Sequence, residues 1–233
     1  MQPEPTYFCG LDLGQAQDFT ALAVLEKPVQ KPGDKGRPVY SVRHLERWEL
    51  GTPYTEIVKD VAKRVERPPL RDSLLIVDKT GVGTAVVDMF TEARLPVRLR
   101  PALITSGHAV TPGEGGGVHV PKIELASTLQ ALLQARRLLI VQSLPEAAVL
   151  GQELATFRVK VTTAGNETFE AWRERDHDDL VLAVALAAWW AETMHSESYI
   201  TCFEVPLDPN RRRGYLFPRR DRYMEHSDHW PIV

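Results

Sequence analysis

Acidic residues stand at the junctions of apolar segments at three places in this chain. Asp12 and Asp78 each follow a short apolar run, and the pair Asp178 and Asp179 precedes a long one, residues 180–191. Because buried strands and helices seldom present acids at three such junctions, we expect these acids to converge on a positive charge. Carboxylate oxygens are the ligands that Mg²⁺ prefers, usually together with waters and substrate phosphates.

A pair of divalent ions held by such acids has a definite chemistry. Two ions about 3.5 to 4 Å apart can activate a water and stabilise the leaving oxygen in phosphodiester cleavage. No histidine or cysteine nucleophile is then required. The acids therefore predict a pocket for divalent ions such as Mg²⁺ or Mn²⁺, and phosphodiester cleavage is a reaction that such a pocket can support.

Each acid taken alone also has a purely structural interpretation. Asp12 and Asp78 both precede turn-forming residues and could simply begin turns. Asp178 and Asp179 could cap a helix, which is worth about 0.3 to 1 kcal/mol for each acid. Their joint placement at the ends of strands and at the start of a helix favours a shared site.

The elements that must position these acids can be read from the spacing of apolar residues. Residues 7–13, 20–26 and 40–48 are rich in β-branched and aromatic side chains and are separated by turn residues, which predicts an antiparallel meander. Apolar residues at helical spacing predict a helix after Thr52, ending before Pro68.

The middle of the chain alternates between predicted strands and helices. Strands at 73–78 and 97–104 flank a helix at 83–93, which indicates parallel pairing. If the first strand lies beside the strand that ends at Asp78, Asp12 and Asp78 emerge at neighbouring positions of the sheet.

The last predicted elements bring the third acid. A glycine-rich loop precedes a helix, a short apolar segment and a further helix, at residues 107–117, 121–133, 138–141 and 145–154. Residues 157–162 and 168–172 flank a turn and predict a β-hairpin. Residues 180–190 are apolar on all sides and predict a buried helix that begins at Asp178 and Asp179.

Composition limits the class of protein. The 233 residues, 43% hydrophobic and 25% charged, predict one main domain at 1–195 and an arginine-rich C-terminal tail at 196–233. A net charge of -3 indicates no general basic surface, so any nucleic-acid contact must come from local patches. Two distant cysteines without metal-site spacing, no secretory signal and no apolar run of ~20 residues predict a cytoplasmic protein without a membrane segment.

Three motifs in order resemble a known family. They are Gly-Leu-Asp-Leu-Gly at 10–14 with Asp-Phe-Thr-Ala at 18–21, Val-Asp-Lys-Thr-Gly-Val-Gly at 77–83, and His-Asp-Asp-Leu-Val-Leu-Ala at 177–183. Together they resemble the nuclease domain of phage terminase large subunits, which belongs to the RNase H-like superfamily. The resemblance runs from about residue 7 to residue 193.

The resemblance implies an α/β fold: an RNase H-like mixed sheet of five or more strands, flanked by helices, with an added β-hairpin. It implies a two-metal endonuclease that cuts double-stranded DNA during phage DNA packaging. Asp12 would be the central bridging carboxylate, Asp78 the second ligand, and Asp179 or Asp178 the third. His177 is a candidate accessory ligand or proton carrier, although such a position is commonly a surface one.

Basic residues near the predicted site could contact DNA phosphates, which dominate DNA affinity. These candidates are Lys79, Lys122, Arg158, Lys160, Arg173 and Arg175. Each also fits a solvated surface role, and the arginine-rich tail could bind nucleic acid, bind a partner or do neither. Expected partners are double-stranded DNA and a separate packaging ATPase, a small terminase or a portal.

The sequence also departs from the family pattern, and other functions compete with a packaging nuclease. The chain has no Gly-x-x-x-x-Gly-Lys-Ser/Thr loop, so we expect no ATP hydrolysis by that route and no nucleotide cofactor. Gln15-Ala16-Gln17 and the short length argue against an actin or sugar-kinase fold. A separate nuclease subunit, a solitary relative or an excised domain would each fit. The alternatives are a Holliday-junction resolvase-like nuclease and a non-catalytic packaging or DNA-binding protein with the same fold.

Overall fold

The computed structural model describes residues 6–14, 18–30, 36–81, 84–157 and 178–194. The chain divides into two units, Met1–Ala191 and Glu192–Val233. The fold described below is that of the first unit. All of the predicted hairpin except residue 157, and the whole predicted tail, lie outside the described residues.

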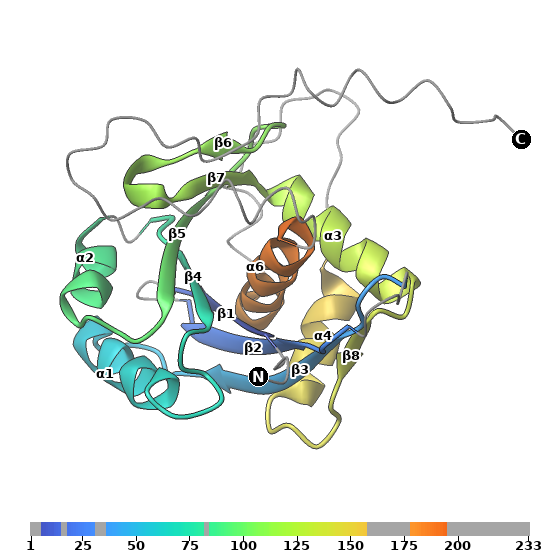
Figure 1. The fold of residues 1–233 in the computed structure, drawn as a ribbon, viewed down its shortest axis with the longest axis horizontal. Helices are drawn as coiled ribbons and strands as arrows, with labels where there is room; N and C mark the ends of the chain where they lie inside the picture. The colour runs from blue at the N-terminus through green and yellow to red at the C-terminus, as the bar shows by residue number, and fades with distance from the viewer. Residues whose placement is uncertain (1–5, 15–17, 31–35, 82–83, 158–177, 195–233) are drawn as a thin grey trace, which may run out of the picture. The chain divides into compact units, whose positions relative to one another are not determined.

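The N-terminal strands form the expected antiparallel meander (Figure 1). It consists of β1 Thr6–Asp12, β2 Ala21–Lys27 and β3 Tyr40–Arg47. Strand β1 pairs with β2 along its whole length, from Thr6 opposite Lys27 to Asp12 opposite Ala21. Asp12 is therefore the last residue of a fully paired strand.

The remaining strands extend the meander on both sides into an eight-stranded mixed sheet among the described residues. Strand β4 Leu74–Asp78 is parallel to β1, β5 Arg98–Thr105 to β4, and β7 Val118–Pro121 to β5. Strand β8 Leu138–Ile140 is parallel to β3, and β6 Thr111–Pro112 is antiparallel to β7. The order is β6-β7-β5-β4-β1-β2-β3-β8.

Strand β7 and the short strand β6 depart from the sequence-based expectation. The predicted glycine-rich loop contains β6 and a 3-10 turn, η1 Glu114–Gly116, in which Gly115 and Gly116 have positive φ. Strand β7 follows directly and is only four residues long. So short a strand beside glycines carries too little alternation to be recognised.

The two faces of the sheet pack against different helices. Side chains along a strand alternate between these faces. One face packs against helices α1 Tyr54–Val65 and α2 Thr84–Glu92. The strand residues in this part of the core are Cys9, Leu11, Leu22, Val24, Leu75 and Val77. Asp12 and Asp78 occupy the alternate positions and so face the opposite side.

Helix α6 Asp179–Thr193 covers that opposite side, and its residues 179–191 are all buried, as predicted. A Cβ on Gly10 would lie 2.0 Å from the Ala183 carbonyl oxygen and 3.0 Å from the Ala187 backbone nitrogen. The absence of a side chain at Gly10 therefore lets α6 lie directly on β1. The Tyr40 hydroxyl donates to the Ala191 carbonyl at 3.2 Å and ties the other end of α6 to β3.

Helices α3 Lys122–Gln134 and α4 Ala147–Thr156 lie on the same side as α6 (Figure 1). Helix α1 begins at Tyr54 and α4 at Ala147, both within two residues of the expected starts.

Within the described part of the chain, no helix is both long enough and apolar enough to cross a membrane.

Candidate active site

Asp12 and Asp78 lie side by side at the ends of two parallel strands. The register pairs Leu11 with Val77, so the next residues on both strands are the two acids. Their exposed fractions are only 8% for Asp12 and 3% for Asp78. The Thr80 N–H donates to Asp78 Oδ1 at 2.8 Å, which fixes the orientation of this carboxylate at the start of the turn.

Asp178 and Asp179 reach the site from the beginning of α6. Asp179 is the first helical residue and is 4% exposed, and its Oδ2 has no hydrogen-bond partner among the described residues. Asp178 is partly exposed, and its carboxylate accepts from Lys122 Nζ at 3.2 Å. The two neighbouring acids therefore have different surroundings.

The charges of the other predicted acids act on Asp12. Burial raises the pKa of Asp12 well above its usual value, and the charges of Asp78, Asp178 and Asp179 raise it further. Burial likewise raises the pKa of Asp179 to about 7, with contributions from the charges of Glu153, Asp178 and Asp18. Such a cluster favours either bound protons or a bound cation.

Glu153 is a member of this region that the sequence did not reveal. It lies in α4, is 6% exposed, and accepts hydrogen bonds from the Leu180 and Val181 N–H groups at 3.1 Å each. Burial is the main reason that its pKa rises to about 7. Glu153 and its two N–H donors are far apart in sequence, so no motif or spacing links them. Asp18, the first residue of the motif at 18–21, also acts on this region, because its charge contributes to the raised pKa of Asp179.

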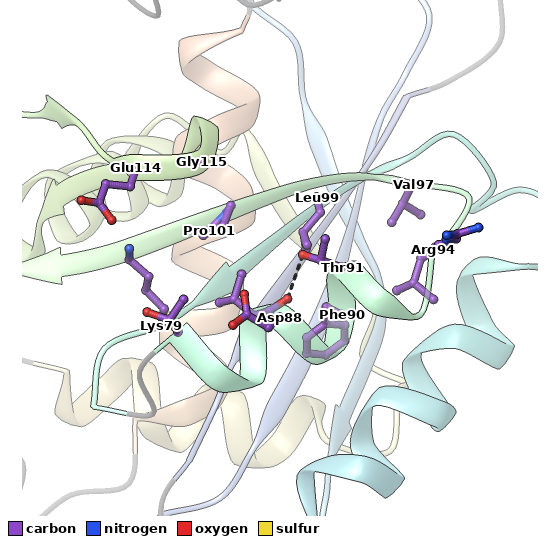
Figure 2. Close-up of a pocket in the computed structure, with 13 residues that line it drawn as sticks. Lys79, Asp88, Phe90, Thr91, Arg94, Val97, Leu99, Pro101, Glu114 and Gly115 are labelled. Carbon is purple, nitrogen blue, oxygen red and sulfur yellow. Dashed lines mark hydrogen bonds between the residues drawn. The ribbon is translucent and has the colours of Figure 1, made fainter. Parts of the chain in front are cut away.

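The predicted basic residues are placed differently from one another. Lys122, the first residue of α3, lies at the acid cluster through its ion pair with Asp178. Lys79 instead lines a pocket of about 550 Å³ formed with residues of α2 and β5, including Asp88 and Pro101 (Figure 2). This pocket is on the α2 side of the sheet, whereas Asp12 and Asp78 face the opposite side.

His177 and the basic residues at 158, 160, 173 and 175 lie outside the described residues.

The donor set suits a hard divalent cation in chemistry but not in its present arrangement. The clustered groups are carboxylates, and the buried Asp179 Oδ2 is an oxygen for which a cation would provide a partner. Within the described residues, however, no three Asp, Glu, His or Cys side chains are arranged so that they could hold a metal ion. Metal binding at this cluster is therefore a proposal.

Comparison with known proteins identifies relatives of the chain. It is 26% identical over 186 residues to the protein described as "Terminase, large subunit" of Thermus phage G20c, which covers 80% of this chain and 32% of that protein. The crystal structure of the large terminase nuclease from thermophilic phage G20c superposes with a TM-score of 0.56 and 24% identity, covering 80% of this chain and 82% of that one. The chain is similar to a terminase nuclease domain.

This similarity defines the fold and its extent. The predicted RNase H-like α/β fold, a mixed sheet flanked by helices, is confirmed. The chain spans about a third of the length of the curated Thermus phage relative, 32%. The HK97 bacteriophage large terminase also matches, with a TM-score of 0.48, 17% identity, and coverage of 82% of this chain and 40% of that one. No protein-family model matches the chain.

Proposed function

We propose that this chain is a divalent-metal-dependent endonuclease that cleaves double-stranded DNA. The observation that carries the proposal is the convergence of Asp12, Asp78, Asp178 and Asp179 from two strands and one helix onto one side of the sheet. The similarity to a terminase nuclease domain supports the same function.

Each acid has a role in this proposal. Asp12 interacts with the acids of both β4 and α6, so it is the residue suited to bridge two ions. Asp78 would hold one ion, and Asp179 or Asp178 the other. When bound, Mg²⁺ or Mn²⁺ supplies an activated water and stabilises the leaving oxygen of the phosphodiester. The Thr80 N–H keeps the Asp78 carboxylate in place for this role.

The proposed biological setting is phage DNA packaging. The curated relative is named as a terminase large subunit, and we propose that a packaging ATPase acts together with this nuclease. A small terminase or a portal are further proposed partners. Lys122 lies where it could contact a phosphate beside the acids, whereas a DNA contact by Lys79 would lie on the other side of the sheet.

The proposal is tested by cleavage of supercoiled plasmid with Mn²⁺, Mg²⁺ or EDTA. We expect metal-dependent nicking or linearisation by the natural chain. In Asp78→Asn the cleavage rate should fall at least about 100-fold, since removing a residue that only contacts a metal ligand already costs about 10- to 100-fold in metal affinity or activity. Asparagine keeps an oxygen that accepts the Thr80 N–H, so this variant should fold. Its unfolding temperature serves as the check.

The matched control is Asp88→Asn, an exposed acid of α2 on the other side of the sheet. It should cleave like the natural chain. Equal cleavage by Asp78→Asn and Asp88→Asn would contradict the proposal. A four-way junction assayed beside linear duplex separates a resolvase from a duplex-cutting enzyme, and we expect the duplex to be cut.

A further inference from the structure

Glu153 is a buried carboxylate that joins three elements beside the acid cluster. Its Oε2 accepts the N–H groups of Leu180 and Val181 in the first turn of α6. Its Oε1 lies 3.6 Å from a guanidinium nitrogen of Arg47, at the end of β3. Glu153 itself belongs to α4, so one side chain connects α4, α6 and the edge of the meander.

These contacts partly offset the cost of burying a carboxylate at this position. The first N–H groups of a helix have no partner within the helix, and a carboxylate at that end is favoured by the helix dipole. The Asp178 side chain is engaged by Lys122, and Glu153 provides the acceptor for the N–H groups that follow Asp179. Arg47 supplies a compensating charge, which a buried carboxylate requires.

Arg47 is itself held in place. Its guanidinium carbon lies 4.3 Å from the centre of the Phe19 ring, a cation–π contact. Phe19 directly follows Asp18, whose charge raises the pKa of Asp179. Phe19, Arg47 and Glu153 therefore form a chain of contacts from the segment before β2 to the first turn of α6.

The consequence concerns Asp179. The two N–H groups bound by Glu153 belong to the two residues that follow Asp179, so the bonds fix the position of the helix at the point where Asp178 and Asp179 enter the cluster. We propose that Glu153 is a positioning residue, with Arg47 as its counter-ion, that holds these two acids at the cluster proposed to bind metal. The inference rests on the proposed metal-dependent nuclease function.

The hydrogen bonds of Glu153 support this positioning role. Glu153 Oε2 already accepts two backbone N–H groups, and Oε1 faces Arg47. A carboxylate used in this way acts on the site through the backbone of α6. Partners of this indirect kind typically change metal affinity about 10- to 100-fold when removed.

The test measures Mn²⁺ binding to the DNA-free protein by electron paramagnetic resonance, together with the Mn²⁺ dependence of plasmid cleavage. Glu153→Ala removes the acceptor, and we expect Mn²⁺ affinity to fall about 10- to 100-fold. Glu153→Gln keeps an oxygen that can accept both N–H groups, so a smaller loss is expected. Glu146→Gln, at the start of the same helix, is the control and should bind Mn²⁺ like the natural chain.

The two readouts separate positioning from simple stabilisation. If Glu153→Ala only lowers the unfolding temperature, while Mn²⁺ affinity below that temperature matches the control, the inference is overturned. If Glu153→Ala does not fold, Arg47→Met, which removes the counter-ion of Glu153, carries the test. We expect it to bind Mn²⁺ more weakly than the control, and natural Mn²⁺ affinity in folded Arg47→Met overturns the inference. A natural chain that neither binds Mn²⁺ nor cuts DNA would overturn the proposed function itself.

Discussion

At the scale of single residues, Asp178 and Asp179 are adjacent but not equivalent. Asp178 is paired with Lys122. The charge of Asp178 raises the pKa of Asp12 more than the charge of Asp179 does. Asp179 is more deeply buried and has an oxygen without a hydrogen-bond partner among the described residues. An unpartnered buried oxygen is costly, and a cation would relieve that cost.

We therefore predict that Asp179→Asn lowers metal-dependent cleavage more than Asp178→Asn does. The cleavage rate should fall about 100-fold or more in Asp179→Asn and within about 10-fold in Asp178→Asn. The scale is the 10- to 100-fold loss of metal affinity or activity that follows removal of a residue contacting a metal ligand. Single-turnover cleavage at saturating Mn²⁺ measures both. The opposite ranking would assign the ligand role to Asp178, in keeping with its stronger effect on Asp12.

The sequence revealed the acids of this cluster but not all of their partners. Asp12, Asp78 and the acidic pair could be found because each interrupts an apolar pattern at the end of an element. Glu153 could not, because its position within a helix predicts only a helical residue. Its function arises from contacts with residues 27 and 28 positions away, which no local pattern encodes.

At the scale of elements, the close approach of α6 to β1 determines whether the acids meet. Gly10 permits this approach, because a Cβ would lie 2.0 Å from the Ala183 carbonyl oxygen. The atoms in conflict belong to backbone and cannot rotate away, as a flexible side chain could. Helix α6 would therefore have to move, and Asp178 and Asp179 with it.

We predict that Gly10→Ala lowers the free energy of unfolding by about 1 to 3 kcal/mol or more, the usual cost of overpacking. Urea unfolding measures this change, and cleavage under native conditions should fall as well. The matched control is Gly151→Ala in α4, where an added Cβ meets nothing within 4 Å. Alanine there should stabilise by about 0.5 to 1 kcal/mol through helix propensity. Equal stability of the two variants would contradict the packing argument.

Most elements were predictable, and the exceptions share a cause. The meander, β4, β5 and helices α1, α2 and α6 have apolar patterns long enough to show a period. Strands β6 and β7 have two and four residues; β7 pairs with the edge of β5, and β6 pairs with β7. Pairing with a distant strand is a tertiary effect, so the local sequence gives little signal of it.

At the scale of the whole molecule, the buried acids oppose folding at neutral pH. The pKa values of Asp179 and Glu153 rise to about 7 in the folded chain, chiefly through burial, and the pKa of Asp12 rises as well. The ordinary values are 3.8 for aspartate and 4.5 for glutamate. At pH values between the ordinary and the raised pKa of these acids, the folded chain binds more protons than the unfolded chain. The free energy of unfolding therefore falls as pH rises.

We predict that, in EDTA, the free energy of unfolding decreases from about pH 5 to about pH 7, as this linkage requires. Asp12→Asn removes one of the protonated groups and should make the decrease shallower, whereas the exposed control Asp88→Asn should leave it unchanged. Urea unfolding at several pH values measures the slope. A slope that is the same in all three proteins would show that the acid cluster does not cause it.

The same argument predicts the effect of metal. A cation that binds only the folded chain stabilises it by about 2.7 kcal/mol at a concentration of 100 times its dissociation constant. The gain should be largest near pH 7, where the carboxylates release their protons most readily, and small near pH 5, where protons compete with the metal. An increase in unfolding temperature with Mn²⁺ that is equal at both pH values, or equal in Asp12→Asn, would place the metal outside this cluster.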